Sequence, residues 1–139
     1  MKWRPVASFV LLASASGNTL AGDCLKYEPA KVHLSGTIAR ETFPGPPNYE
    51  SVASGDAAET IWVLRLSKPI CTVSSSSDEI NEAENDQSEL QLVLEPAQYK
   101  RYRALVGRRV TATGTLFHAI SGHHHKTLLL TTEALSGIA

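Results

Sequence analysis

The chain has 139 residues, of which 42% are hydrophobic and 19% are charged, and its formal net charge at pH 7 is −1. This length allows one domain, and the composition is typical of a globular rather than a disordered protein. A net charge this close to zero does not favour nucleic-acid binding, which normally requires a basic face.

The first 21 residues have the three parts of a secretory signal peptide. Lys2 and Arg4 are basic, residues 6–13 are apolar but too few to span a bilayer, and Thr19-Leu20-Ala21 offers small residues for cleavage. We expect cleavage after Ala21, which leaves residues 22–139 as a single periplasmic or secreted domain. A buried N-terminal helix fits less well, because no polar face follows the apolar run. No other apolar segment is long enough to span a membrane.

The chain has two cysteines, Cys24 and Cys71. In an oxidising compartment an even pair is best interpreted as a disulfide, which would stabilise the fold by about 4 kcal/mol in the chain-entropy model. Two metal ligands are the weaker alternative, since neither cysteine belongs to a Cys-x-x-Cys pair.

The first strand is predicted over residues 31–42, with Gly36 in mid-strand marking a bulge or strong coiling of the sheet. Residues 43–58, here called the proline loop, contain three prolines near their start and cannot continue a strand. We expect an ordered, shaped loop there. Residues 60–66 are apolar on both faces and predict a second strand.

Residues 74–89 begin with four consecutive serines and contain six acidic residues but one large apolar residue, Ile80. Such a segment cannot bury enough apolar surface to offset its ordering entropy, so it is predicted to be a solvated, disordered acidic loop that is dispensable for folding. A short third strand follows at residues 90–94.

A helix is predicted from Pro96, which suits a first helical turn, to a stop at Gly107. The tyrosines and arginines between them would also suit a nucleic-acid surface, but an amphipathic helix that caps a core is the favoured interpretation. The residues predicted to face the core are Tyr99, Tyr102, Leu105 and Val106. Those predicted to face solvent are Lys100, Arg101 and Arg103.

Residues 110–118 alternate between two faces with the period of a strand that has one buried face. Ile120-Ser121-Gly122 breaks this pattern, and three consecutive histidines follow before a fifth strand at residues 127–132 and a short tail at residues 133–139. Residues 119–126 are here called the histidine loop.

The predicted fold is all-β with one short helix, a five-stranded OB-fold-like Greek-key barrel, because a helix between the third and fourth of five strands is the OB-fold pattern. A generic five-stranded roll is the alternative. In an OB-fold the first and fourth strands are neighbours, so Gly36 and Gly114 would lie on paired strands.

Several motifs resemble the uncharacterised bacterial family called domain of unknown function 4431. The resemblance covers essentially residues 22–139, and its motifs are Cys24-Leu25-Lys26-Tyr27-Glu28-Pro29, Phe43-Pro44-Gly45-Pro46-Pro47-Asn48-Tyr49-Glu50, Lys68-Pro69-Ile70-Cys71, Gly114-Thr115-Leu116-Phe117-His118-Ala119 and Gly122-His123-His124-His125. It implies no particular activity. It implies an exported protein, in some cases beside modules that resemble lysozyme inhibitors.

OB-fold ligands lie across the second and third strands, between the two loops that correspond here to the proline and histidine loops. The first functional hypothesis is therefore a binding module for a periplasmic protein or a cell-wall saccharide. For Trp62, burial in the core is an equally good interpretation. The predicted ligand-binding residues are Phe43, Pro46, Pro47, Tyr49, Trp62, His124 and Lys126.

The alternative hypothesis is a zinc or copper site, because imidazoles bind both ions. His123 and His125 point to one side of an extended loop and would share the metal with His118, whereas His124 points away. A solvent-exposed polar turn without metal is the competing interpretation. We expect no enzyme, since the sequence contains no nucleophile elbow, no His-Glu-x-x-His motif and no phosphate loop.

Overall fold

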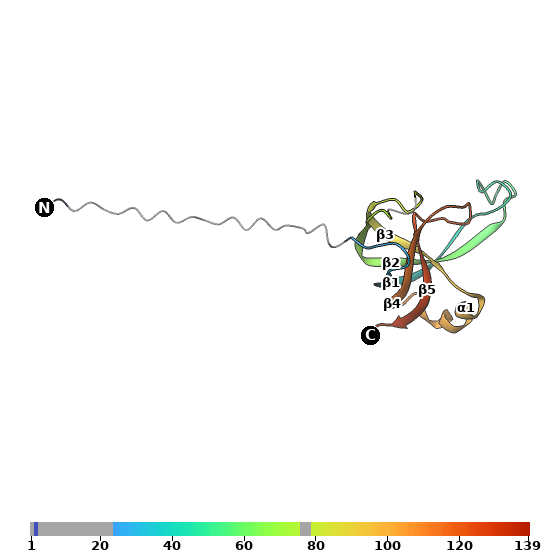
Figure 1. Ribbon diagram of the computed structural model, residues 1–139. Helices are drawn as coiled ribbons and strands as arrows, with labels where there is room; N and C mark the ends of the chain where they lie inside the picture. The colour runs from blue at the N-terminus through green and yellow to red at the C-terminus, as the bar shows by residue number, and fades with distance from the viewer. Residues whose placement is uncertain (1, 3–23, 76–78) are drawn as a thin grey trace.

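The computed structural model describes residue 2, residues 24–75 and residues 79–139 (Figure 1). The predicted signal peptide at residues 1–21 lies outside the described residues except for residue 2. Within the described part of the chain, no helix has the length and hydropathy needed to cross a membrane.

Five strands close into a barrel in the order β1-β2-β3-β5-β4. The fold is mostly β with one short α-helix between β3 and β4, as predicted (Figure 1). Strands β3 and β5 pair in parallel, and all other neighbours pair antiparallel. The elements are β1 (Lys31–Pro44), β2 (Ala58–Thr72), β3 (Glu84–Val93), α1 (Pro96–Tyr102), the 3-10 helix η2 (Arg103–Leu105), β4 (Arg109–His118) and β5 (Leu128–Gly137).

Strands β1 and β4 pair as predicted, with Val32 opposite Gly114 and Gly36 opposite Val110. Both positions require glycine, because a neighbouring strand leaves no room for a Cβ atom. A Cβ at Gly36 would lie 2.4 Å from the carbonyl oxygen of Arg65 on β2, and one at Gly114 would lie 2.0 Å from that of Thr131 on β5. The alternating apolar residues of both strands fill the barrel interior.

Strand β2 runs well past the predicted end at residue 66 and includes Pro69, which register shifts between Arg65 and Ile70 accommodate. The predicted Cys24–Cys71 disulfide is confirmed, with a Cα–Cα distance of 4.6 Å. It joins the start of the described domain to the end of β2. Strand β5 similarly includes most of the predicted tail at residues 133–139.

The prediction of a disordered loop over residues 74–89 is wrong at its C-terminal end, because β3 begins at Glu84. Ladder hydrogen bonds do not require apolar side chains, so an acidic segment can extend a strand. Before it, the buried side chain of Asn81 accepts a hydrogen bond from the backbone N–H of His118 at 3.0 Å. Residues 76–78 lie outside the described residues.

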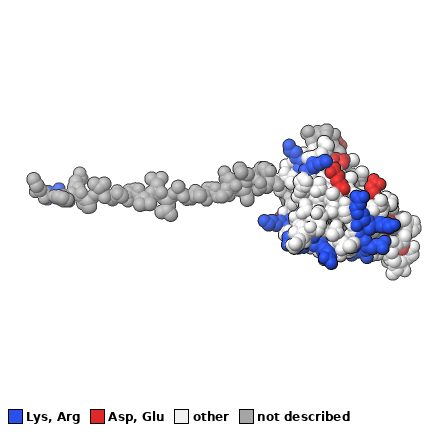
Figure 2. Space-filling model, turned by 90° about the horizontal axis from the view of Figure 1, so that it is seen from below, with Lys and Arg blue, Asp and Glu red and all other residues white. Residues whose placement is uncertain are grey.

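Helix α1 ends at Tyr102, and the predicted helix finishes as the 3-10 helix η2. Tyr102, Leu105 and Val106 pack against the barrel core as predicted, but Tyr99 is 38% exposed. Lys100, Arg101 and Arg103 face solvent, and Figure 2 shows basic side chains gathered at the end of the molecule where α1 lies.

Candidate functional site

The proline and histidine loops meet at Tyr49 and His123. The Tyr49 hydroxyl lies 3.2 Å from His123 Nε2, and the two rings meet edge to face with centroids 5.5 Å apart. A Cβ at Gly122 would lie 2.9 Å from the Tyr49 ring, so glycine allows this close approach. The two loops that carry the predicted ligand-binding residues are therefore in direct contact.

Glu59, near the start of β2, connects the two outer histidines. Its Oε1 lies 2.5 Å from His123 Nδ1, and its Oε2 lies 2.7 Å from His125 Nε2. The hydrogen bond with His125, followed by that with His123, lowers the pKa of Glu59 against the opposing effect of burial. Sequence reasoning missed Glu59, because its role depends on where the histidine loop packs against the barrel.

The histidine loop is also anchored to the outer face of the barrel by Gln91 on β3. The Gln91 side chain donates to the His123 carbonyl at 3.0 Å and accepts from the His125 N–H at 2.7 Å. Gln91 is buried, as is its cross-strand partner Val63, which lies outside the main core cluster. The loop thus covers part of the β2–β3 face on which OB-fold ligands usually lie.

His125 and Lys126 lie beneath the loop surface. The His125 ring stacks on Phe43 with centroids 4.6 Å apart and an interplanar angle of 6°. Lys126 Nζ forms ion pairs with Glu41 at 3.1 Å and Glu89 at 2.5 Å. Burial opposes the charge on Lys126, but hydrogen bonds to Glu89 and Glu41 raise its pKa. Phe43 and Lys126, both predicted to bind ligand, therefore hold the loop in place.

The remaining histidine of the loop, His124, accepts a hydrogen bond from the Ile120 N–H at Nδ1, 3.0 Å away. Its ring meets Phe117 edge to face at a centroid distance of 5.4 Å. Burial, and then the charges of His123 and His125, lower the pKa of His124. His124 Nδ1 therefore carries no proton of its own and is engaged within the loop.

The proline loop is ordered around Asp56. This buried carboxylate accepts the backbone N–H groups of Asn48, Glu50 and Ser51, each at 2.9 Å. The bonds from Ser51, Glu50 and Asn48 lower the pKa of Asp56. The predicted ligand-binding residues Pro46, Pro47 and Tyr49 stand exposed on this loop.

Trp62 is not part of the loop surface. It is 5% exposed and belongs to the barrel core, so the core interpretation is the correct one. The Tyr99 ring packs edge-on against it at 5.2 Å, and the Arg40 guanidinium lies 6.0 Å from its centroid. A buried indole in this position cannot stack on a ligand.

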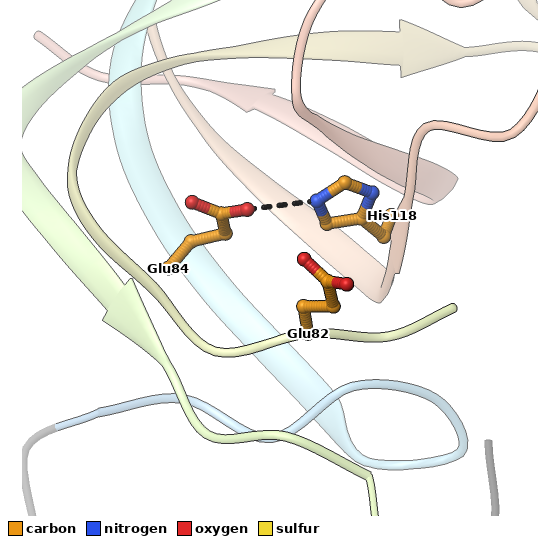
Figure 3. A group of neighbouring side chains, drawn as sticks. All are labelled: Glu82, Glu84 and His118. Carbon is orange, nitrogen blue, oxygen red and sulfur yellow. Dashed lines mark hydrogen bonds and ion pairs between the residues drawn. The ribbon is translucent and has the colours of Figure 1, made fainter. Parts of the chain in front are cut away.

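The three histidines predicted to share a metal take different partners. His118 turns to Glu84, with Nε2 2.8 Å from Oε1, whereas His123 and His125 turn to Glu59. Across residues 24–75 and 79–139, the one group of at least three potential metal ligands is Glu82, Glu84 and His118 (Figure 3). The predicted trio is therefore not assembled. Sequence reasoning assigned both glutamates to a disordered loop and so did not join them with His118.

His118 is held at both ring nitrogens. Nδ1 donates to the Ala119 carbonyl at 3.1 Å while Nε2 faces Glu84. Burial opposes the charge on the imidazole, but the hydrogen bonds with Glu84 and Ala119 and the charges of Glu84 and Glu82 outweigh it. These contacts raise the pKa of His118 above its usual value.

Comparison with curated proteins finds no match. A family model described as domain of unknown function (DUF4431) matches residues 89–136, which run from the C-terminal half of β3 to near the end of β5. This segment includes the Gly122-His123-His124-His125 motif but not the proline loop, so the resemblance is confirmed over this part of the chain. Over residues 89–136 the chain is similar to the family of domains of unknown function called DUF4431.

Proposed function

We propose that this chain is an exported binding module of the OB type that recognises a protein through the joined tips of the proline and histidine loops. The contact between Tyr49 and His123 is the observation that carries the proposal, because it builds one surface from two loops distant in sequence. Asp56 orders one loop, and Glu59 with Gln91 anchors the other. A surface held in this way is pre-organised, which lowers the entropic cost of binding.

The strand order β1-β2-β3-β5-β4 with a helix between β3 and β4 supports an OB-type barrel. In that fold ligands lie between the two loops described above. Here the histidine loop covers part of the β2–β3 face on which such ligands usually lie. The surface that remains accessible to a partner is therefore formed by the loop tips. That surface presents Tyr49, 36% exposed, and His123, whose side chain is 63% exposed.

A protein partner is favoured over a cell-wall saccharide by the state of the aromatic rings. Sugars need an open aromatic face to stack on, but Phe43 is covered by His125 and Trp62 is buried. The two loops also expose the large aliphatic side chains of Val52, at 47%, and Ile120, at 62%. Aromatic and apolar groups mixed with polar ones are typical of the centre of a protein interface.

Export is supported by the Cys24–Cys71 disulfide, since disulfides persist in oxidising compartments. The intact mass of the chain recovered from the periplasm should correspond to residues 22–139 less two protons. A retained N-terminus or free thiols before reduction would contradict the export proposal.

The binding proposal is tested by capturing periplasmic proteins on the disulfide-bonded chain, with soluble peptidoglycan fragments as a parallel probe. Tyr49→Ala and His123→Gln should each weaken partner binding by at least about tenfold while leaving the unfolding transition cooperative. Tyr99→Ala is the matched control, because Tyr99 is a tyrosine of similar exposure that lies on α1.

Equal capture by wild type and Tyr49→Ala, or loss of capture in Tyr99→Ala alone, would place recognition elsewhere. Specific retention of peptidoglycan fragments, lost in Tyr49→Ala, would keep the surface but overturn the choice of a protein partner.

A further inference from the structure

We infer that Glu82, Glu84 and His118 form a binding site for a divalent transition-metal ion, with zinc as the best-matched ion. The site does not depend on the proposed recognition surface, because none of its residues belongs to either loop tip. It lies where the end of β4 meets the segment that leads into β3, and Figure 3 shows the three side chains turned toward one another.

The chemistry of the three groups suits zinc. The site offers one imidazole nitrogen and two carboxylate oxygens, and these atoms all lie within 4.8 Å of one another. Zinc binds such atoms at about 2.0–2.2 Å, so small rotations would bring them to a common centre. Glu82 is exposed and Glu84 and His118 are partly buried, which leaves one side open for water or a further ligand.

The orientation of His118 favours metal binding at Nε2. The Ala119 carbonyl can only accept a hydrogen bond, so Nδ1 carries the proton that it donates at 3.1 Å. This is the usual arrangement of a metal-binding histidine, in which a backbone carbonyl fixes the tautomer and the other nitrogen faces the ion. Nε2 faces the Glu84 carboxylate at 2.8 Å, so a cation is needed between these two acceptors. A proton or a metal ion can fill that position.

The backbone that carries the ligands is fixed without any metal. The Tyr27 hydroxyl donates to the Glu82 carbonyl at 2.5 Å, and the Glu84 N–H donates to Thr72 Oγ1 at 3.1 Å. Thr72 follows the disulfide-bonded Cys71. Metal sites require ligands that are held in place by rigid surroundings. Here β2, β4 and the disulfide form those surroundings.

The test is isothermal titration of the disulfide-bonded, tag-free chain with Zn²⁺, because an affinity tag of histidines would bind the same ion. We expect one zinc ion per chain and a rise in melting temperature on zinc addition. Glu82→Gln is the decisive variant, since the exposed Glu82 side chain takes no part in the hydrogen bonds that hold this segment. Glu82→Gln should weaken zinc binding by at least about tenfold. Mutating a residue that only hydrogen-bonds to a metal ligand already has an effect of this size.

Two further variants separate this site from the histidine loop and from general charge. Glu79→Gln removes a nearby exposed acid, and His123→Gln alters the histidine loop; both should bind zinc like the wild type. Cobalt substitution with X-ray absorption should show one imidazole among oxygen ligands. The proposal is overturned if zinc does not bind, if Glu82→Gln binds it as tightly as wild type, or if His123→Gln removes it. The His118–Glu84 pair would then be a proton-bridged contact only.

Discussion

Gln91 on β3 accepts a hydrogen bond from the backbone N–H of His125 at 2.7 Å and so fixes the histidine loop to the outside of the barrel. The same side chain donates to the His123 carbonyl, which makes a two-point clamp on a loop of otherwise irregular structure. The clamp explains why the polar Gln91 is buried on β3 between the core residues Leu90 and Leu92.

Replacing Gln91 with leucine should therefore destabilise the protein. The substitution leaves one backbone N–H and one backbone C=O of the loop without their partners, and we expect a loss of about 1–3 kcal/mol in the free energy of unfolding. Urea denaturation would measure it. Gln87→Leu is the control, because within the described residues the Gln87 side chain donates one hydrogen bond, to the nearby Asn85 carbonyl, and the change should shift stability by less than about 0.5 kcal/mol. Equal effects from both variants would contradict the clamp.

Glu59 should make the stability of the histidine loop depend on pH. Its folded-state pKa lies below the ordinary value of 4.5, so its contribution is present above that pH and is lost as pH falls through the folded-state pKa. Glu59→Gln should therefore lower the free energy of unfolding at pH 6, and the gap from wild type should narrow below about pH 4. Denaturation across pH 3–7 would show this, with the exposed acid Glu79→Gln as the control. A gap that does not change with pH would contradict it.

The sequence alone predicted the strands that have one buried face, because the period-two pattern records which side meets the core. It also predicted the disulfide and the meeting of the proline and histidine loops, which follows from the strand order. It did not predict that β3 begins at Glu84, since ladder hydrogen bonds leave no apolar signature. The sequence also did not predict the roles of Glu59 and Gln91, because each residue contacts a loop that lies more than 30 residues away in the chain.

The barrel should not accept a side chain at Gly114. A Cβ there would lie 2.0 Å from the Thr131 carbonyl oxygen, and a backbone atom of the paired strand cannot move aside without breaking the β4–β5 ladder. Gly114→Ala should cost at least about 1–3 kcal/mol of stability, as overpacking does. Gly137→Ala on β5 is the matched control, because the nearest atom to its new methyl group is a Leu105 side-chain carbon at 3.4 Å, an ordinary contact. Thermal melts of both variants would show a large shift for Gly114→Ala and a small one for Gly137→Ala.

The segment that precedes β3 should be structural rather than dispensable. The Asn81 side chain is buried and accepts the backbone N–H of His118, which ties this segment to the end of β4. Asn81→Ala would leave that N–H unpaired in a partly buried position, so we expect a loss of about 1–3 kcal/mol in the free energy of unfolding. Glu79→Ala, two residues earlier and exposed, should change stability by less than about 0.5 kcal/mol. Chemical denaturation of the two variants side by side measures this difference. If both unfold at the wild-type midpoint, Asn81 does not anchor the segment.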